Sequence, residues 1–259
     1  MRIGHEFGRA VPSSSRPRVL WAIPARDGNT WAEFTVSYGY CMALFQKENI
    51  ECEPYIHSGD AFIQKARNMS VAKFMSNPLN GYLIMGDVDQ AWQLQPFIDM
   101  LYSEHEFTAM CPRVKCDTEI YSTKLNGKIT GKFMETDRVG TGFVIFKRSV
   151  FEKMFEAYPE LRCYDYDVDG GNGYSLFSLL EKKHVTGEDL VFCDRWKAIG
   201  GGIHVHTDSP MRHMGPQAWE GNIKNVLKKG LRIRDSFIDK INNVIKNMEV
   251  RNELSANAV

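Results

Sequence analysis

The sequence lacks four features, each of which would define a broad class of protein. It has no Cys-X-X-Cys pair and no secretory-type apolar segment at its N-terminus. No apolar run approaches the roughly 20 residues that a membrane-spanning helix needs. It also has no net charge, because 32 Lys and Arg residues balance 32 Asp and Glu residues. No membrane span is therefore expected, and the balanced charge argues against a dedicated, sequence-independent nucleic-acid binder, whose affinity comes mainly from phosphate neutralisation.

The cysteines are scattered along the chain instead of clustered. There are six of them: Cys41, Cys52, Cys111, Cys116, Cys163 and Cys193. This distribution is typical of reduced thiols and unlike that of a disulfide framework or a zinc site. We therefore expect a soluble, cytoplasmic protein.

Short apolar strands alternate with helical segments, which predicts a single α/β domain. The expected strands cover 19–23, 51–56, 82–85, 107–111 and 143–146, and the expected helices cover 30–46, 63–74, 96–102, 150–157 and 187–196. Residues 1–17 contain two prolines, three serines and three arginines, and we expect a flexible arm there. We expect the folded domain to cover 18–221 and a helical extension to cover 222–259.

An acidic motif closes one of the expected strands. Asp87-Val88-Asp89 follows the apolar run 82–85, and two carboxylates at i and i+2 in a short loop can reach one hard cation such as Mg²⁺ or Mn²⁺. Because Asp is also common in turns that merely face solvent, the motif alone leaves both interpretations open. Arg67 and Asn68 lie on the helix before this strand, where a guanidinium suits bidentate contact with phosphate.

Two loops are candidates for ligand contact. The first expected strand breaks at Pro24, Arg26 and Asp27, and the loop past the first strand often meets the ligand in nucleotide-binding α/β domains. Gly140, Thr141 and Gly142 precede another strand, and glycine allows backbone N–H groups to approach a ligand closely. A solvated turn and a tight turn feeding a buried strand are the respective alternatives.

Further candidates lie in the last third of the chain. Glu188 and Asp189 occupy the first turn of an expected helix, where the helix dipole alone could account for one of them. His204 and His206 would share one face of a strand. His213 stands two residues before Gly215 in a late His-X-Gly, and neutral imidazole is an acceptable Mn²⁺ ligand.

The order of these motifs resembles that of the nucleotide-sugar-dependent glycosyltransferases of the GT-A fold, across roughly 19–221. The resemblance implies a Rossmann-like α/β domain with a mixed, mainly parallel sheet flanked by helices. It also implies that Asp87 and Asp89 hold Mn²⁺ or Mg²⁺ on the diphosphate of the donor, with His213 as the third protein ligand and His206 as the alternative.

The resemblance further assigns roles to the remaining candidates. Asp189, or else Glu188, would be the general base that deprotonates the acceptor if the reaction inverts configuration. The implied donor-binding residues are Pro24, Arg26, Asp27, Arg67, Asn68, Asp87, Gly140, Thr141 and Gly142.

The predicted activity is transfer of a sugar from a nucleoside diphosphate sugar to a hydroxyl of a glycan or of a modified DNA base. One alternative is a phosphoryl-transfer or hydrolytic enzyme that uses the same Asp-X-Asp. The haloacid-dehalogenase pattern is disfavoured, because Gln90-Ala91-Trp92 follows where that family normally has Gly-Thr. The other alternative is a non-catalytic module that binds sugars or nucleic acid. Donor base, donor sugar, stereochemical outcome and oligomeric state stay open.

Overall fold

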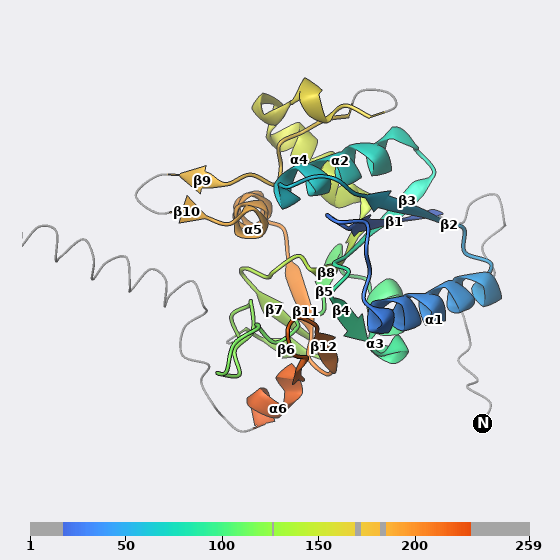
Figure 1. Cartoon of the computed structure of the whole chain (residues 1–259). Coiled ribbons are helices and arrows are strands. Elements are labelled where there is room, and N and C mark those ends of the chain that lie inside the picture. Colours follow the sequence, from blue (N-terminus) through green and yellow to red (C-terminus); the bar gives the residue numbers. More distant parts are fainter. Residues whose placement is uncertain (1–17, 126, 169–171, 182–184, 229–259) are drawn as a thin grey trace, which may run out of the picture.

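The computed structural model describes residues 18–125, 127–168, 172–181 and 185–228. Its centre is an eight-stranded sheet with the order β2-β1-β3-β8-β5-β11-β7-β6 (Figure 1). The strands are β1 (Arg18–Pro24), β2 (Cys52–His57), β3 (Asn80–Gly86), β5 (Phe107–Ala109), β6 (Ile129–Thr130), β7 (Phe133–Thr136), β8 (Phe143–Lys147) and β11 (Ile203–His206). The predicted arm at 1–17 and the part of the predicted extension beyond residue 228 lie outside the described residues.

The sheet is mixed, and most of its strands share one direction. β1 pairs in parallel with β2 and β3, and β5 pairs in parallel with β11. β8 runs antiparallel between β3 and β5, and β7 runs antiparallel between β11 and β6. Only β8 and β7 therefore oppose the other six strands, in agreement with the predicted mixed, mainly parallel sheet.

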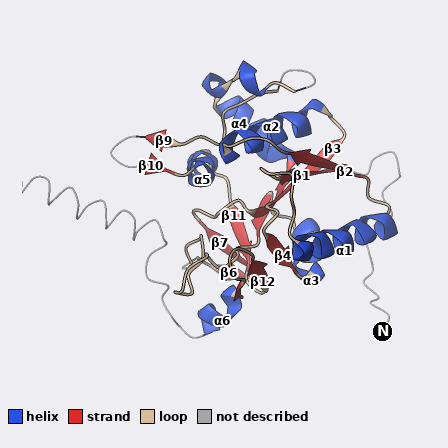
Figure 2. Ribbon diagram, in the orientation of Figure 1, coloured by secondary structure: helices blue, strands red, loops and turns tan. Residues whose placement is uncertain are grey.

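Helices cover both faces of the sheet because its central strands are apolar on both sides (Figure 2). Along β1, Leu20 and Ala22 belong to one hydrophobic cluster, whereas Trp21 belongs to the other. The first cluster includes side chains of α2, α4 and α5, and the second includes side chains of α1 and α3. The helices are α1 (Ala32–Glu48), α2 (Ile63–Ser76), α3 (Leu94–Leu101), α4 (Arg148–Ala157), α5 (Glu188–Ala198) and α6 (Ile223–Lys228), with 3₁₀ turns η2 (Pro159–Leu161) and η3 (Tyr164–Tyr166).

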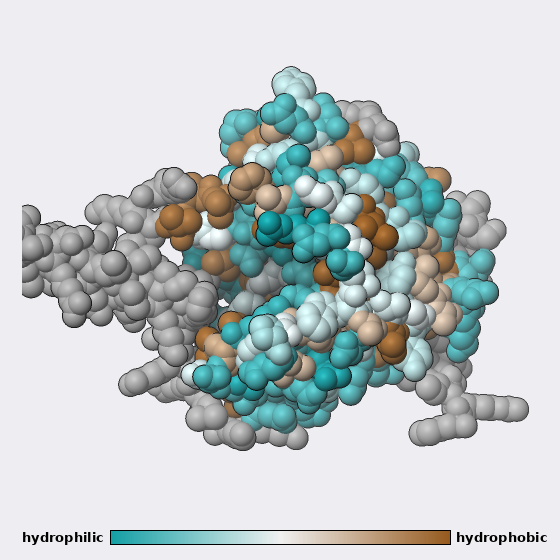
Figure 3. All heavy atoms as spheres, in the orientation of Figure 1, coloured by the Kyte–Doolittle hydropathy of each residue, from teal (hydrophilic) through white to brown (hydrophobic). Residues whose placement is uncertain are grey.

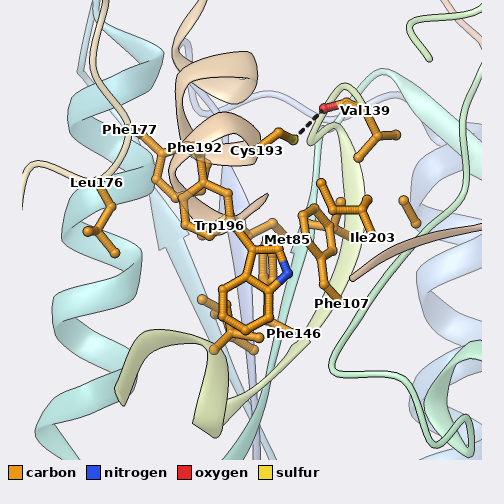
Figure 4. Close-up of a cluster of buried hydrophobic side chains, with 14 of the residues drawn as sticks. Met85, Phe107, Val139, Phe146, Leu176, Phe177, Phe192, Cys193, Trp196 and Ile203 are labelled. Atoms are coloured by element: carbon orange, nitrogen blue, oxygen red, sulfur yellow. Dashed lines mark hydrogen bonds between the residues drawn. The ribbon is translucent and has the colours of Figure 1, made fainter. Parts of the chain in front are cut away.

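Aromatic side chains hold α5 against the sheet (Figure 4). Phe192 of α5 stacks on Phe177 with ring centroids 4.4 Å apart, and Trp196 lies one turn further along the helix. All three side chains are buried. The Cys193 thiol also donates to the Val139 carbonyl. This packing fixes the start of α5, where two of the candidate carboxylates lie.

Two small sheets complete the fold, and neither was predicted. An antiparallel sheet joins β13 (Trp219–Gly221), β12 (Met211–His213) and β4 (Gln90–Trp92), and a hairpin joins β9 (Leu180–Glu181) to β10 (Val185–Thr186). The surface in Figure 3 is mostly hydrophilic, with an apolar patch on this hairpin. Leu179, Leu180 and Val185 are exposed there. None of the described helices has the length and apolar character to cross a membrane.

Three polar or turn-rich places make contacts that a short sequence window does not show. Asp60, shortly before α2, binds His57 and Lys65 instead of capping the helix. Ser149 lies inside α4 and bonds Glu106 instead of capping the helix start. β6 pairs with β7 in a short hairpin.

Candidate active site

The candidate residues gather at one edge of the large sheet because of the strand directions. β1, β2 and β3 run in parallel, so they end at the same edge, followed there by the turn that carries Asp87 and Asp89. β8 runs the opposite way and therefore begins at this edge, directly after Gly142. The Asp87 N–H donates to the Gly142 carbonyl at 2.7 Å. This hydrogen bond joins the turn of Asp87–Asp89, called the acidic turn, to the turn of Gly140–Gly142, called the glycine turn.

A cavity of about 220 Å³ opens at this edge. Pro24 and Arg26 line one side of it, and Asp87 and Asp89 line another, so four predicted residues share one cavity. Asp27 lies apart from this lining. Its side chain is 80% exposed, and its carboxylate lies 3.9 Å from the Arg26 guanidinium.

His57 and Asp60 also line the cavity, and neither was predicted as a site residue. His57 Nε2 lies 2.5 Å from the Asp60 carboxylate, and the other ring nitrogen lies 3.4 Å from the Tyr55 hydroxyl. The hydrogen bond from His57 is the main cause that lowers the pKa of Asp60. A strand-end histidine followed three residues later by an acid is too common a pattern for the sequence to have singled it out.

Arg67 connects the acidic motif to the start of α5. Its side chain is buried, and its guanidinium lies 2.5 Å from Glu188 Oε1 and 3.4 Å from Asp87 Oδ2. Burial lowers the pKa of Arg67, but the carboxylates of Asp87 and Glu188 outweigh it and leave the pKa raised. The guanidinium therefore stays charged. It brings together two carboxylates that are about a hundred residues apart in sequence.

Asp87 is an unusually placed carboxylate. Its Oδ1 is buried with no hydrogen-bond partner among the described residues, whereas its Oδ2 faces Arg67. Burial raises the pKa of Asp87 to about 6, even though Arg67 acts in the opposite direction. Buried polar atoms in folded proteins nearly always have a partner, so an unbonded carboxylate oxygen indicates a place for a cation or a donor group.

Glu188 and Asp189, adjacent in sequence, have different surroundings. Glu188 is bound to Arg67, whereas Asp189 Oδ1 accepts a hydrogen bond from the Leu190 N–H at 2.8 Å. Burial raises the pKa of Asp189, the nearby Arg67 lowers it, and the Glu188 carboxylate raises it further, so the net shift is upward. A raised pKa is a property that suits a carboxylate for accepting a proton, whereas the Glu188 carboxylate is paired with Arg67.

The turn of Gly140–Gly142 packs closely against both acids and against the side chains of Gln90 and Ser122. A Cβ atom at Gly142 would come within 2.0 Å of Gln90 Nε2 and 2.9 Å of Asp87 Oδ2. A Cβ atom at Gly140 would lie 3.5 Å from Asp189 Oδ2. Thr141 lies between them, fully buried, with a hydroxyl that has no hydrogen-bond partner in the described part of the chain.

Asp89 and His213 meet because β12 pairs with β4. This pairing sets His213 opposite Gln90, the residue that follows Asp89, and the Met214 N–H donates to the Asp89 carbonyl at 2.7 Å. As a result His213 Nε2 lies 3.5 Å from Asp89 Oδ2. The same ring binds the Arg113 carbonyl at 2.9 Å through Nδ1. A carbonyl only accepts, so Nδ1 carries a proton, and Nε2 is the ring nitrogen that faces Asp89.

Lys115 is the third partner of this pair and was not predicted. Its ammonium lies 2.5 Å from Asp89 Oδ2. Burial raises the pKa of Asp89, but the hydrogen bonds from His213 and Lys115 outweigh it and leave the pKa lowered. Asp89 is thus held as a carboxylate by two nitrogen groups.

The side chains of Asp87, Asp89 and His213 carry oxygen and nitrogen atoms of the kind that bind a hard divalent cation. These side chains do not, however, converge on one point. Asp87 has an unbonded oxygen, and His213 directs Nε2 towards Asp89. In the described ranges, however, no group of three His, Cys, Asp or Glu side chains is gathered closely enough to hold a metal ion. Asp87, Asp89 and His213, the expected metal ligands, are therefore not gathered around one point, because Arg67 and Lys115 contact the two carboxylates.

Two other predicted residues lie elsewhere. Asn68 is fully buried, and its side-chain amide bonds both the N–H and the carbonyl of Phe177, so it anchors a loop instead of facing the cavity. His206 is buried against Asp99 and lies apart from the acidic turn. Its Nδ1 accepts from the Asp208 N–H, which leaves no ring nitrogen for a ligand.

No protein-family model and no curated protein matches the chain. Solved structures with a similar fold include protein A197 from STIV, at 14% identity and a TM-score of 0.49 over 80% of this chain and 91% of that one. The catalytic domain of Drosophila β1,4-galactosyltransferase 7 in complex with xylobiose matches at 15% identity and a TM-score of 0.44, over 82% of this chain and 73% of that one. A mutant of that enzyme in complex with manganese, UDP-Gal and xylobiose matches at 15% identity and a TM-score of 0.44, over 86% and 78% of the two chains.

The strand order and directions thus give the mixed, mainly parallel sheet flanked by helices that was predicted for the domain. Glycosyltransferases of the GT-A fold stand among the solved structures that resemble this chain.

Proposed function

We propose that this protein is a metal-dependent glycosyltransferase, which moves a sugar from a nucleoside diphosphate sugar to a hydroxyl of a glycan or of a modified DNA base. The observation that carries the proposal is the Arg67 bridge. One buried guanidinium contacts both the acidic turn after β3 and the first turn of α5. A group that binds a diphosphate and a group that accepts a proton therefore lie in one site.

Asp189 is the proposed general base. In an inverting displacement, the acceptor oxygen forms a bond to the anomeric carbon of the sugar while the bond from that carbon to the diphosphate oxygen breaks. The hydroxyl proton moves to Asp189, whose raised pKa suits this task. Glu188 holds Arg67 in place and is the less suitable base, because its carboxylate is already paired.

The diphosphate would lie against Arg67 and the acidic turn. Arg67 supplies a charge that is fixed by burial, so little reorganisation is needed when negative charge develops on the leaving group. Asp87, Asp89 and His213 are the residues that would hold a divalent cation, once Asp89 exchanges its contact with Lys115. When bound, the cation neutralises charge on the departing diphosphate.

The nucleoside of the donor would occupy the cavity beyond the acidic turn. This cavity adjoins Asp87 and Asp89 and is lined by Pro24 and Arg26. Asp60 adds a carboxylate that could accept hydrogen bonds from ribose hydroxyls. The sugar would lie beside the turn of Gly140–Gly142, which is close to both Asp87 and Asp189.

The test is a thermal-shift screen of nucleotide sugars with and without Mn²⁺, followed by assay of nucleoside diphosphate release. A ligand that binds only the native state raises its melting temperature. We expect a shift that requires Mn²⁺ and that disappears in Asp89→Ala. Asp189→Asn should keep the shift and lose transfer by about a thousandfold, the scale of general-base catalysis.

Other outcomes would contradict parts of the proposal. An undiminished Mn²⁺-dependent shift in Asp89→Ala would remove this site from consideration. A donor shift without any release of nucleoside diphosphate would favour a binding module over an enzyme. Release at the same rate in Asp189→Asn as in the wild type, with an acceptor present, would exclude Asp189 as the base.

A further inference from the structure

The Lys115 ammonium lies where a divalent cation would meet Asp89. It is 2.5 Å from Asp89 Oδ2, the same oxygen that faces His213 Nε2 at 3.5 Å. We propose that Lys115 is a built-in competitor for the metal, which occupies Asp89 until the diphosphate of the donor draws it away. This inference rests on the proposed metal-dependent function.

The segment that carries Lys115 is held in a defined turn. The Arg113 guanidinium donates to the carbonyls of Cys116 and Asp117 at 3.0 and 2.7 Å. The Arg113 carbonyl accepts from His213 Nδ1. The same segment therefore positions one proposed metal ligand and delivers the ammonium that competes at another.

Gly215 provides the path for the Lys115 side chain. A Cβ atom at Gly215 would lie 3.4 Å from Lys115 Cδ and 2.9 Å from the Trp219 ring. The aliphatic part of Lys115 thus crosses the turn after β12 at a position that has no side chain. This close approach makes the contact between Lys115 and Asp89 a feature of the fold and distinguishes it from a chance surface pair.

Competition follows from the charges. Asp89 Oδ2 gains a strong electrostatic contact from either the ammonium or the divalent cation, but two cations repel each other at one oxygen. The Lys115 side chain is 32% exposed, so it is able to leave Asp89 and bind an anion nearby. A diphosphate would accept it and thereby release Asp89 to the metal. Metal and diphosphate should consequently bind with positive coupling.

The experiment measures Mn²⁺ binding by isothermal titration calorimetry and by the Mn²⁺ paramagnetic resonance signal, with and without saturating inorganic pyrophosphate. Lys115→Met is compared with Lys115→Arg, which keeps the charge. Lys132→Met is the matched control, because Lys132 makes a similar contact with Asp99. Circular dichroism melting checks that each variant is folded.

We expect Lys115→Met to bind Mn²⁺ alone about tenfold more tightly than the wild type, as suits removal of a partly buried charge contact. Lys115→Arg and Lys132→Met should match the wild type. Pyrophosphate should tighten Mn²⁺ binding more in the wild type than in Lys115→Met, because only the wild type has an ammonium to draw away.

Three results would overturn the inference. Equal Mn²⁺ affinity in the wild type and Lys115→Met, with binding lost in Asp89→Ala, would reject the role of Lys115 and leave the proposed function standing. An equal gain in Mn²⁺ affinity in Lys132→Met would show that the effect comes from the change in net charge alone. Absence of Mn²⁺ binding in every variant, with and without pyrophosphate, would overturn this inference and the metal-dependent function together.

Discussion

Two clusters in this protein combine an aspartate, a histidine and a lysine. They differ in how fully the polar atoms in and beside each cluster are hydrogen-bonded. In one, Asp99 of α3 meets His206 at 3.2 Å and Lys132 at 2.8 Å, and Gln95 also donates to it. In the other, Asp89 meets His213 at 3.5 Å and Lys115 at 2.5 Å. In both, burial raises the pKa of the aspartate, yet its hydrogen-bonding partners leave that pKa lowered.

The difference lies in what surrounds each cluster. Both oxygens of Asp99 are bonded, and both ring nitrogens of His206 have partners. Beside Asp89, by contrast, stands a second acid, Asp87, whose Oδ1 has no partner in the described part of the chain. Each cluster lines a cavity of about 220 Å³, so the unbonded buried oxygen beside Asp89 is what distinguishes them. A fully bonded polar cluster contributes to the fold, whereas an unbonded buried oxygen suits a ligand.

The largest expected difference between the clusters is in activity. Asp87→Asn keeps the size of the side chain and removes its charge, so metal-dependent release of nucleoside diphosphate should fall by at least about a hundredfold. Asp99→Asn is the matched change in the other cluster and should stay within about twofold of the wild type. Equal losses in the two variants, measured by the release assay, would show that the clusters do not differ in function.

The next largest difference is in stability. Arg67→Met should lower the free energy of unfolding by about 3 kcal/mol, because it leaves two carboxylates without their buried cation. Lys132→Met should cost no more than about 1 kcal/mol, since the Lys132 side chain is 58% exposed. Urea denaturation measures both values. A loss below about 1 kcal/mol in Arg67→Met would contradict a central role for its guanidinium.

The smallest expected effect is on the pH dependence of stability, and it concerns His204, two residues before His206. His204 stacks on His105 with ring centroids 3.5 Å apart, and burial with the nearby His105 lowers the pKa of His204 to about 4. Between pH 6.5 and 4 the unfolded chain therefore binds a proton at this residue that the folded chain does not, and stability falls as pH falls. The charged groups that bear on His204 also include Glu135 and Lys197.

His204→Gln should remove part of this pH dependence while leaving the stability profile above pH 7 parallel to that of the wild type. Chemical denaturation at several pH values measures it. An unchanged slope between pH 6.5 and 4 in the variant would locate the acid sensitivity elsewhere.

The sequence was most informative where the signal is local. The apolar runs of β1 and β3, the turns that end them and the acids at 87 and 89 are all visible within short windows, and they lie where they were expected. β4, β12 and β13 escaped prediction because each has only three residues, too few to show a period. Their pairing is nevertheless what brings His213 to Asp89.

Contacts between distant segments account for most of what the sequence could not reveal. Lys115 and Arg67 carry no local sign of the carboxylates that they bind. Asn68 has an amide side chain of the kind that often binds ligands, but this amide bonds the N–H and the carbonyl of Phe177. The choice between Glu188 and Asp189 likewise depended on Arg67, which lies more than a hundred residues earlier in the chain.

The antiparallel alignment of β12 on β4 has a consequence for engineering. Side chains alternate between the two sides of a strand, so moving β12 by one position would turn His213 away from Asp89 and bring a neighbour of opposite orientation into its place. The register of β12 on β4 is therefore as much a requirement of the proposed site as the imidazole itself. A variant in which β12 slips by one residue would separate His213 from Asp89 without a change in any residue of the cavity.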